Sequence, residues 1–344
     1  MNKTNQLKKE VKKMAEIIFF ETEPWEQEYL KKNLKNHKFK GYKARLTEKN
    51  VKLAKNAEIL GVFVWDKIDK KILDKLPKLK AIMTTSTGFD HIDIEECKKR
   101  KITVCNVPSY GENTVAEQAM GLLLAITRKI IESVERTRKG NFSLEGLRGT
   151  DLKGKTIGII GTGRIGTYMC KYAKAFEMKV LAYDKFPNKE KAKKIGFEYA
   201  KLNRLLKESD IISFHVPYCK ETHHMINKEN IKKLKKGCII INTARGKLID
   251  TSALLTGLKK GNIAGCGLDV LEEETAIKEE KELAKLTKVK QKLVKEEKLL
   301  LKNKRVLITP HNAFNTTEAL TRIMQTTVEN IKAFLKGKPQ NIVK

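Results

Sequence analysis

One short segment constrains the fold of this 344-residue chain more than any other: a glycine-rich turn that joins an apolar strand to a helix. Lys155–Ile160 carries the apolar run of a buried strand. Gly161, Gly163 and Gly166 follow it in the spacing G-x-G-x-x-G, and the next apolar run ends at Asp184, 18 residues beyond Gly166. This succession of strand, turn, helix and strand predicts a parallel α/β sheet with the turn at its carboxyl edge.

The same turn indicates what the sheet binds. Gly161 allows a tight turn, Gly163 lets the backbone approach a pyrophosphate, and Gly166 permits close packing of the helix. The N-terminus of the helix offers N–H groups and its positive dipole end to phosphate. Asp184 can accept hydrogen bonds from both ribose hydroxyls and would repel a 2′-phosphate, which predicts NAD rather than NADP. The alternative is a purely structural glycine-rich turn, which the full context disfavours.

The rest of the chain continues this alternation of short apolar runs and helical patterns. The expected strands are Glu16–Phe20, Glu58–Trp65, Leu79–Thr84, Lys101–Asn106, Lys155–Ile160, Lys179–Tyr183, Ile211–His215, Cys238–Asn242, Ala264–Val270 and Arg305–Thr309. Long helices are expected over 113–137 and 316–335. The Lys-rich segment 275–304 predicts an amphipathic helix with Leu283, Leu286, Val289 and Leu293 on its apolar face and a solvated Lys/Glu face. A partner-binding arm is the alternative.

The net charge of +30 comes mainly from lysine, because only 11 of the 71 basic residues are Arg. Specific nucleic-acid readers rely on Arg forks and on aromatic side chains, which make up 6% of this sequence. We therefore expect no specific nucleic-acid partner, although weak binding to polyanions at low salt remains an alternative.

Compartment and metal content can also be predicted. No apolar run approaches the ~18–20 residues that cross a bilayer, and the N-terminus lacks the apolar stretch of a signal peptide, so we expect a cytoplasmic protein without a membrane partner. The six cysteines form no C-x-x-C pair, which predicts reduced thiols and no metal site. The role of residues 1–13 stays open.

Two side chains that follow later strands suit the binding of a carboxylate and the transfer of a proton beside a nicotinamide. Arg245 follows the strand Cys238–Asn242, and its planar fork can grip a carboxylate bidentately and stays charged. His311 follows Arg305–Thr309, and an ordinary imidazole titrates near ~6.5, as a general acid/base should. A carboxylate beside it would favour the imidazolium. By composition Glu272, Glu273 and Glu274 are all candidates, and each of these positions could instead serve the structure.

The chain resembles the NAD-dependent D-2-hydroxyacid dehydrogenase family, most closely its D-lactate dehydrogenase branch. The resemblance covers about residues 15–335 and rests on the order and spacing of eight segments: 86–93, 106–110, 113–117, the glycine-rich turn, 215–217, 242–246, 267–274 and 310–314. It implies two doubly wound domains of the Rossmann/flavodoxin-like class with parallel sheets. An NAD-binding domain, 113–311, would be inserted into a substrate domain formed by 1–112 and 312–344, with the ligands in the cleft between them.

The resemblance also assigns residues. Arg245, Glu274 and His311 would be catalytic, with Glu274 selected by its spacing from Asp269. Cofactor contacts would come from Gly161, Gly163, Arg164, Ile165, Gly166, Asp184, Val216, Pro217, Thr222, Thr243, Ala244 and Asp269. Substrate contacts would come from Ser86, Thr87, Gly88, Tyr110, Arg245 and Phe314. A homodimer would form through the helix after Asn113. Gln118 departs from the family pattern, which more often has an apolar or aromatic residue there.

These assignments predict an oxidoreductase for a small D-2-hydroxy acid, with D-lactate and pyruvate as the first choice. Other 2-oxo acids, such as hydroxypyruvate, glyoxylate or 2-oxoisocaproate, are the alternatives within the enzyme class. From another class, an NAD-gated interaction protein like the corepressors that share this fold would use the basic surface and the Lys-rich segment as partner sites.

Overall fold

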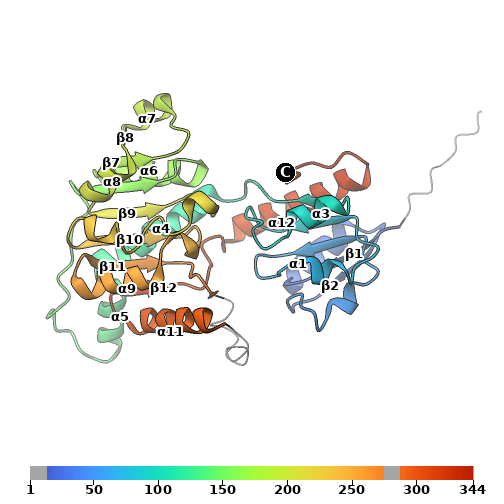
Figure 1. The fold of residues 1–344 in the computed structure, drawn as a ribbon, viewed down its shortest axis with the longest axis horizontal. Coiled ribbons are helices and arrows are strands. Elements are labelled where there is room, and N and C mark those ends of the chain that lie inside the picture. The colour runs from blue at the N-terminus through green and yellow to red at the C-terminus, as the bar shows by residue number, and fades with distance from the viewer. Residues whose placement is uncertain (1–13, 275–286, 344) are drawn as a thin grey trace, which may run out of the picture. The chain divides into compact units, whose positions relative to one another are not determined.

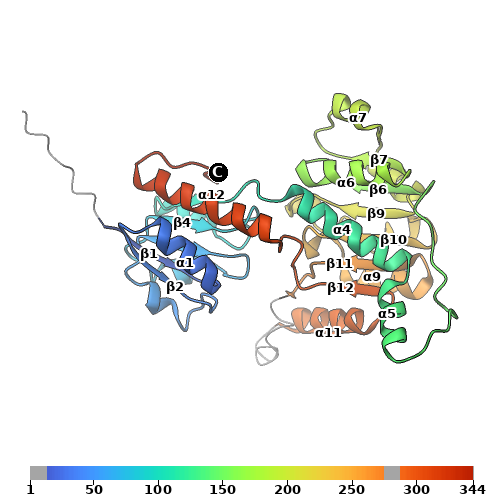
Figure 2. The same ribbon diagram turned by 180° about the vertical axis from the view of Figure 1, so that it is seen from behind.

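A computed structural model describes residues 14–274 and 287–343 (Figures 1 and 2). The chain divides into two compact units. The first contains the described residues up to Tyr110 and those from Leu320 onward, and the second is Gly111–Ala319. The second boundary lies within helix α12 (Thr317–Leu335), so residues 312–319, expected in the substrate domain, belong to the second unit.

The first unit is built on a five-stranded parallel sheet in the order β2-β1-β3-β4-β5. Its strands are β1 (Glu16–Phe19), β2 (Lys38–Gly41), β3 (Ile59–Val62), β4 (Ala81–Thr84) and β5 (Thr103–Cys105). Its helices are α1 (Pro24–Asn33), α2 (Lys70–Leu73), α3 (Ile94–Lys99) and most of α12, with a 3₁₀ turn at Val51–Ala54. The central strands β3 and β4 are buried at every position, as strands with both faces covered must be.

The second unit is built on a seven-stranded parallel sheet in the order β12-β11-β10-β9-β6-β7-β8. Its strands are β6 (Thr156–Ile160), β7 (Lys179–Tyr183), β8 (Glu198–Tyr199), β9 (Ile211–Phe214), β10 (Cys238–Asn242), β11 (Ile263–Leu268) and β12 (Val306–Ile308). The chain runs outward from β6 to β8 and then returns to the other side of β6. The strand order therefore reverses between β6 and β9, which is where ligands bind in such sheets.

Helices cover both faces of this sheet, and a hydrophobic cluster fills each interface (Figures 1 and 2). Side chains of α4 (Glu112–Thr127) and α6 (Arg164–Ala175) form one cluster, and those of α8 (Leu202–Glu208), α9 (Thr251–Lys260) and α11 (Lys288–Lys302) contribute to the other. The remaining elements are α5 (Ile130–Arg138), α7 (Lys189–Ile195) and the 3₁₀ turns Lys220–Thr222, Ile231–Lys233 and Gly246–Leu248. This confirms the expected fold class.

Two helix predictions need correction. The single helix expected over 113–137 is two helices, because Lys129 between α4 and α5 adopts a left-handed conformation with φ of 54°. In the Lys-rich segment, Leu283 and Leu286 lie outside the described residues, and Val289 is 77% exposed rather than buried. The buried positions of α11 are Val294, Glu297 and Leu300, so the supposedly solvated Lys/Glu face includes a fully buried carboxyl.

Within residues 14–274 and 287–343, no helix is long and apolar enough to cross a membrane. The same residues contain no cluster of three or more His, Cys, Asp or Glu that could hold a metal ion.

Candidate active site

The glycine-rich turn connects β6 to α6, and two of its glycines are required by contacts. Gly161 has a φ of 94°, and a Cβ there would lie 2.5 Å from the carbonyl oxygen of His215. A Cβ on Gly166 would lie 1.8 Å from the carbonyl oxygen of Gly161. Gly163 differs, because a Cβ there would meet nothing within 4 Å in the described chain. Gly163 is exposed at the start of α6, so this open position fits the close approach of a pyrophosphate.

Asp184 stands at the end of β7 and faces the same turn. Its carboxylate accepts hydrogen bonds from the backbone N–H of Thr162 at 2.6 Å, from the Thr162 hydroxyl at 2.9 Å and from the N–H of Phe186 at 2.8 Å. Burial alone would raise the pKa of Asp184, but these donors outweigh it and hold the pKa below its ordinary value. The side chain therefore remains ionised beside the turn, as discrimination against a 2′-phosphate requires.

The loop after β9 lies against the turn at the point where the strand order reverses. A Cβ on Gly161 would come within 2.7 Å of Val216 Cγ1. Thr222 closes this loop by donating from its hydroxyl to the Pro217 carbonyl at 2.8 Å and accepting from the Cys219 N–H at 2.8 Å. Arg164 is exposed at the first position of α6, 3.7 Å from Glu112. Ile165 packs against the α4–α6 core cluster.

A tight turn that is closed by Asn242 holds the backbone of Arg245. Asn242, buried at the end of β10, donates to the Arg245 carbonyl at 2.9 Å and accepts from the Ala244 N–H at 3.0 Å. Gly246 lies so close to the chain at Leu271 that a Cβ would be 2.1 Å from its carbonyl carbon. The loop that carries Thr243, Ala244 and Arg245 therefore packs directly against the backbone of residues 271–272.

His311 and Glu274 contact each other. His311 Nδ1 lies 3.1 Å from Glu274 Oε2, both side chains are largely buried, and Glu274 Oε1 accepts the N–H of Leu271 at 2.9 Å. His311 adopts a φ of 56°, a conformation uncommon outside glycine and typical of functional sites. With Nδ1–H directed at the carboxylate, Nε2 is the ring nitrogen that can exchange a proton with a ligand.

Asp269 fixes the backbone around His311. It accepts hydrogen bonds from the Thr309 hydroxyl at 2.5 Å, the Asn312 N–H at 3.0 Å and the Ala313 N–H at 2.9 Å. Burial raises the pKa of Asp269 above its ordinary value although these donors and His311 favour its charged form. The expected contact of Asp269 with a nicotinamide stays a prediction, but its hold on the 309–313 loop explains the unusual conformation of His311.

The other two acidic candidates have different partners. Glu272 accepts from the N–H and hydroxyl of Thr251 at 2.9 and 2.7 Å and lies 2.8 Å from His224 Nε2. Glu273 forms an ion pair with Lys290 of α11 at 2.9 Å. Of the three carboxylates that composition left open, Glu274 is the one that contacts His311.

The expected substrate residues fall in both units. In the first unit, the side chains of Ser86 and Thr87 donate to the carbonyls of Gly88 and Val107 at 2.6 and 2.7 Å. No backbone acceptor in the described chain takes the N–H groups of Ser86, Thr87 or Gly88, as a carboxylate-binding turn requires. Tyr110 is half-buried in the first unit, and Phe314 is half-buried in the second, three residues beyond His311.

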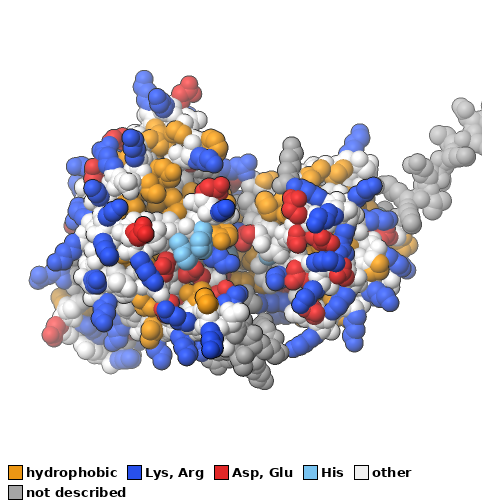
Figure 3. Space-filling model, viewed as in Figure 1, with side chains coloured by type: hydrophobic (Ala, Val, Ile, Leu, Met, Phe, Trp, Pro, Cys, Tyr) orange, Lys and Arg blue, Asp and Glu red, His pale blue; other side chains and the backbone are white. Residues whose placement is uncertain are grey.

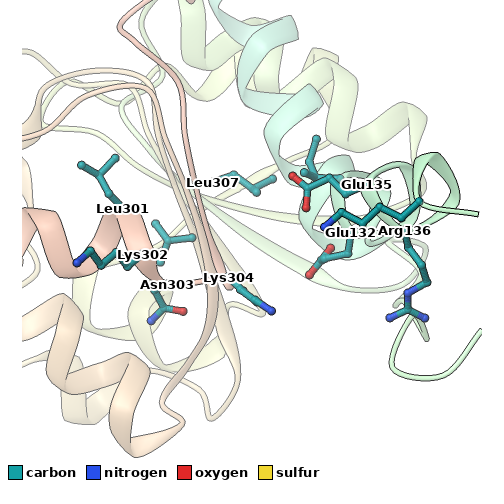
Figure 4. Close-up of a pocket in the computed structure, with 11 residues that line it drawn as sticks. Glu132, Glu135, Arg136, Leu301, Lys302, Asn303, Lys304 and Leu307 are labelled. Atoms are coloured by element: carbon teal, nitrogen blue, oxygen red, sulfur yellow. The ribbon is translucent and has the colours of Figure 1, made fainter. Parts of the chain in front are cut away.

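A separate cavity of about 530 Å³ lies elsewhere in the second unit, between α5 and the end of α11. Figure 4 shows Glu132 and Glu135 of α5 on one side of this cavity and the stretch Leu301–Lys304 on the other. Its lining includes none of the expected cofactor or catalytic residues.

Basic side chains do not gather into one patch on the face shown in Figure 3, where Lys and Arg are spread widely and interspersed with acidic groups. This distribution is the one expected from a general lysine bias.

Known proteins share the sequence pattern and the fold of this chain over most of its length. Residues 120–313 match the family model described as D-isomer specific 2-hydroxyacid dehydrogenase, NAD binding domain. The D-lactate dehydrogenase of Escherichia coli K12 is 37% identical over 326 residues, which cover 94% of this chain and 97% of that protein. A glyoxylate reductase of Thermococcus litoralis is 41% identical over 297 residues, 84% of each chain. The structure of Aquifex aeolicus D-lactate dehydrogenase complexed with NAD and lactic acid superposes with a TM-score of 0.84 at 40% identity, covering 94% and 96% of the two chains.

Proposed function

The chain belongs to the D-isomer-specific 2-hydroxyacid dehydrogenase family, and from this premise we propose that it interconverts D-lactate and pyruvate. The contact between His311 and Glu274 carries the proposed proton transfer, because it supplies an acid/base pair in the same unit as the nucleotide turn. The choice of D-lactate and pyruvate is supported by the D-lactate dehydrogenases that this chain resembles over 94% of its length. The loop of Arg245 packs directly against the segment that leads to Glu274, which supports a shared role for the three side chains.

In the direction of reduction, Arg245 holds the carboxylate of the 2-oxo acid and polarises the ketone oxygen through its planar guanidinium. NADH, when bound, supplies the hydride that C2 gains. Protonated His311 gives its Nε2 proton to the oxygen at C2, and Glu274 stabilises the imidazolium before the transfer. Oxidation of the hydroxy acid reverses these steps, with neutral His311 accepting the hydroxyl proton.

We further propose the roles of the remaining site residues. Ser86, Thr87 and Gly88 would donate backbone N–H groups to the substrate carboxylate, and Tyr110 and Phe314 would limit the space for the substrate side chain. Asp184 would accept the ribose hydroxyls of NAD. We also propose that the remaining residues expected to contact the cofactor do so: Gly161, Gly163, Arg164, Ile165, Gly166, Val216, Pro217, Thr222, Thr243, Ala244 and Asp269.

The substrate preference is tested by following NADH oxidation with pyruvate, glyoxylate, hydroxypyruvate and 2-oxoisocaproate, with NADPH as the cofactor control. We expect the highest kcat/KM with pyruvate and NADH, and D-lactate as the product. A higher value with glyoxylate would assign the chain to the activity of its Thermococcus litoralis relative and overturn the proposed roles of Tyr110 and Phe314. NADH binding without turnover of any acid would favour an NAD-gated interaction protein.

We also propose that the protein is a homodimer that contacts its partner through the helical region after Asn113. Most apolar side chains of helix α4 are buried in the core of the same unit. Helix α5 exposes Ile130, Ile131 and Val134. The segment after it exposes Phe142 and Leu144. Large exposed apolar side chains so close in sequence support a protein interface.

Five of the six cysteines are buried free thiols, which supports a reducing, cytoplasmic compartment.

A further inference from the structure

Helix α11 buries a carboxyl group that the proposed reaction does not use. Glu297 has none of its surface exposed, and it lies between the buried apolar side chains Val294 and Leu300 on one face of the helix. An uncompensated buried carboxylate is costly, and among the described residues no Lys, Arg or His contacts this one. A structural purpose for Glu297 must therefore come from the groups that it does contact.

Glu297 contacts the backbone of the acidic turn formed by residues 272–274. Its Oε1 accepts the N–H of Glu273 at 3.0 Å, and its Oε2 is buried without a hydrogen-bond partner in the described chain. Two helical turns earlier, Lys290 Nζ contacts both carboxylate oxygens of Glu273, at 2.9 and 3.1 Å. Helix α11 therefore holds this turn by its backbone and by its side chain.

The turn 272–274 carries Glu274, the carboxylate that contacts His311. It follows Leu271, against which Gly246 and the Arg245 loop pack, and it is closed by the hydrogen bond from the Leu271 N–H to Glu274 Oε1. The other oxygen of Glu274 faces His311. A shift of residues 272–273 would therefore move Glu274 relative to His311.

We propose that Glu297 is a positioning residue that anchors the turn 272–274, so that α11 sets the orientation of Glu274 toward His311. This inference rests on the proposed function, because it assumes that His311 and Glu274 exchange the substrate proton. It assigns a role to the Lys-rich segment, whose described part would be a brace for the acid/base pair rather than a free partner-binding arm.

The charges around Glu297 suit this role. Burial first, and then the nearby carboxylates of Glu272 and Glu273, raise the pKa of Glu297 to about 7. Those two carboxylates are paired with His224 and Lys290, and the neighbouring Glu296 lies 3.8 Å from Lys292. Near neutral pH about half of Glu297 is protonated, and in either form a carboxyl oxygen can accept the backbone N–H of Glu273. The anchor therefore carries only part of a negative charge beside Glu274.

The proposal is tested by substitutions that remove the hydrogen-bond acceptor of Glu297 but keep the space that its side chain fills. Glu297→Leu removes the acceptor and fills the space, and we expect kcat for pyruvate reduction to fall about 10- to 100-fold, as small displacements of catalytic groups do. Glu297→Gln keeps an acceptor oxygen, so we expect kcat to stay within about threefold of the wild type. The pH at which the reduction rate falls to half should be lower in Glu297→Leu, because a misplaced Glu274 no longer favours the imidazolium.

Glu296→Leu is the matched control, since the neighbouring Glu296 faces Ser252 of α9 at 2.7 Å rather than the acidic turn. We expect it to leave kcat and the pH profile unchanged. An equal loss in Glu296→Leu and Glu297→Leu would show general damage to α11 and overturn the proposal. If Glu297→Leu does not fold, Lys290→Ala loosens the same turn from an exposed position, and an unchanged kcat and pH profile would then count against the inference.

A double-mutant cycle locates the effect. In a Glu274→Gln background, Glu297→Leu should cost little more, because both changes act through the same contact. An undiminished additional loss would overturn a role through Glu274. An inactive wild type would overturn the proposed function and this inference together, whereas an active wild type with full kcat in Glu297→Leu would overturn the inference alone.

Discussion

At the scale of single residues, Gly163 and Gly166 in the same turn are glycines for different physical reasons. A Cβ on Gly166 would collide with the backbone oxygen of Gly161 at 1.8 Å, whereas a Cβ on Gly163 would meet nothing in the described chain. Gly166→Ala should therefore lower the free energy of unfolding by about 2 kcal/mol or more. Gly163→Ala should change it by less than about 0.5 kcal/mol.

The same pair distinguishes folding from cofactor binding. Gly163→Ala should raise the Kd for NADH about tenfold, because the added methyl group occupies the space where the pyrophosphate approaches. Urea unfolding without cofactor and fluorescence titration with NADH measure the two quantities. Unchanged NADH affinity in Gly163→Ala would show that the pyrophosphate does not approach this position.

The residues proposed to act directly on a ligand carry a clearer signal in the sequence than the residues that support them. Arg245 and His311 stand out because their chemistry matches a reaction and because each follows a buried strand. Asn242, Thr162 and Glu297 carry no such signal, since an amide, a hydroxyl or a Glu in a Lys/Glu-rich helix is common in sequences. Their roles depend on which backbone N–H or carbonyl the fold brings within reach.

At the scale of elements, the buried carboxyl of Glu297 makes the stability of the second unit depend on pH. Its pKa is raised from 4.5 to about 7 in the folded protein, so between these values the folded state holds a proton that the unfolded state has lost. The contribution of Glu297 to stability must therefore fall as the pH rises from about 4.5 to 7. Glu297→Gln removes this titration, and relative to it the wild type should lose on the order of 2 kcal/mol over that range.

Urea unfolding of both proteins at several pH values measures this difference. The wild type and Glu297→Gln share all other titrating groups, so those contributions cancel. Parallel stability curves for the two proteins across this range would contradict a proton bound at Glu297 in the folded state.

The sequence predicts the central strands well because they are buried on both faces and are therefore continuous apolar runs, as in β3, β4, β6 and β9. The edge strands β2 and β8 were missed. Lys38–Gly41 contains one large apolar residue, and Glu198–Tyr199 is only two residues long. Both exist because a neighbouring strand offers hydrogen bonds. The break at Lys129 has a different cause: apolar residues recur on both sides of it, so the sequence pattern does not show where the helix ends.

At the scale of the whole molecule, the proposed dimer can be tested with a matched surface control. Phe142 and Leu144 are 78% and 82% exposed in the segment after α5, and Phe186, after β7, is 79% exposed. Replacing Phe142 and Leu144 with Ser should weaken self-association at least about tenfold, because each substitution removes a large apolar side chain that the proposed dimer would bury. Phe186→Ser should leave it unchanged, as measured by sedimentation equilibrium. A monomeric wild type would refute the dimer.

For the whole enzyme, we propose that His311, in contact with Glu274, exchanges the substrate proton while NADH supplies the hydride. The most direct measurement is the rate of NADH oxidation with saturating 2-oxo acid in the wild type and in His311→Ala, together with the Kd for NADH of each. We predict turnover by the wild type, a rate about 10²–10⁴-fold lower in His311→Ala, and equal NADH affinity. Equal rates in the two proteins would contradict the account.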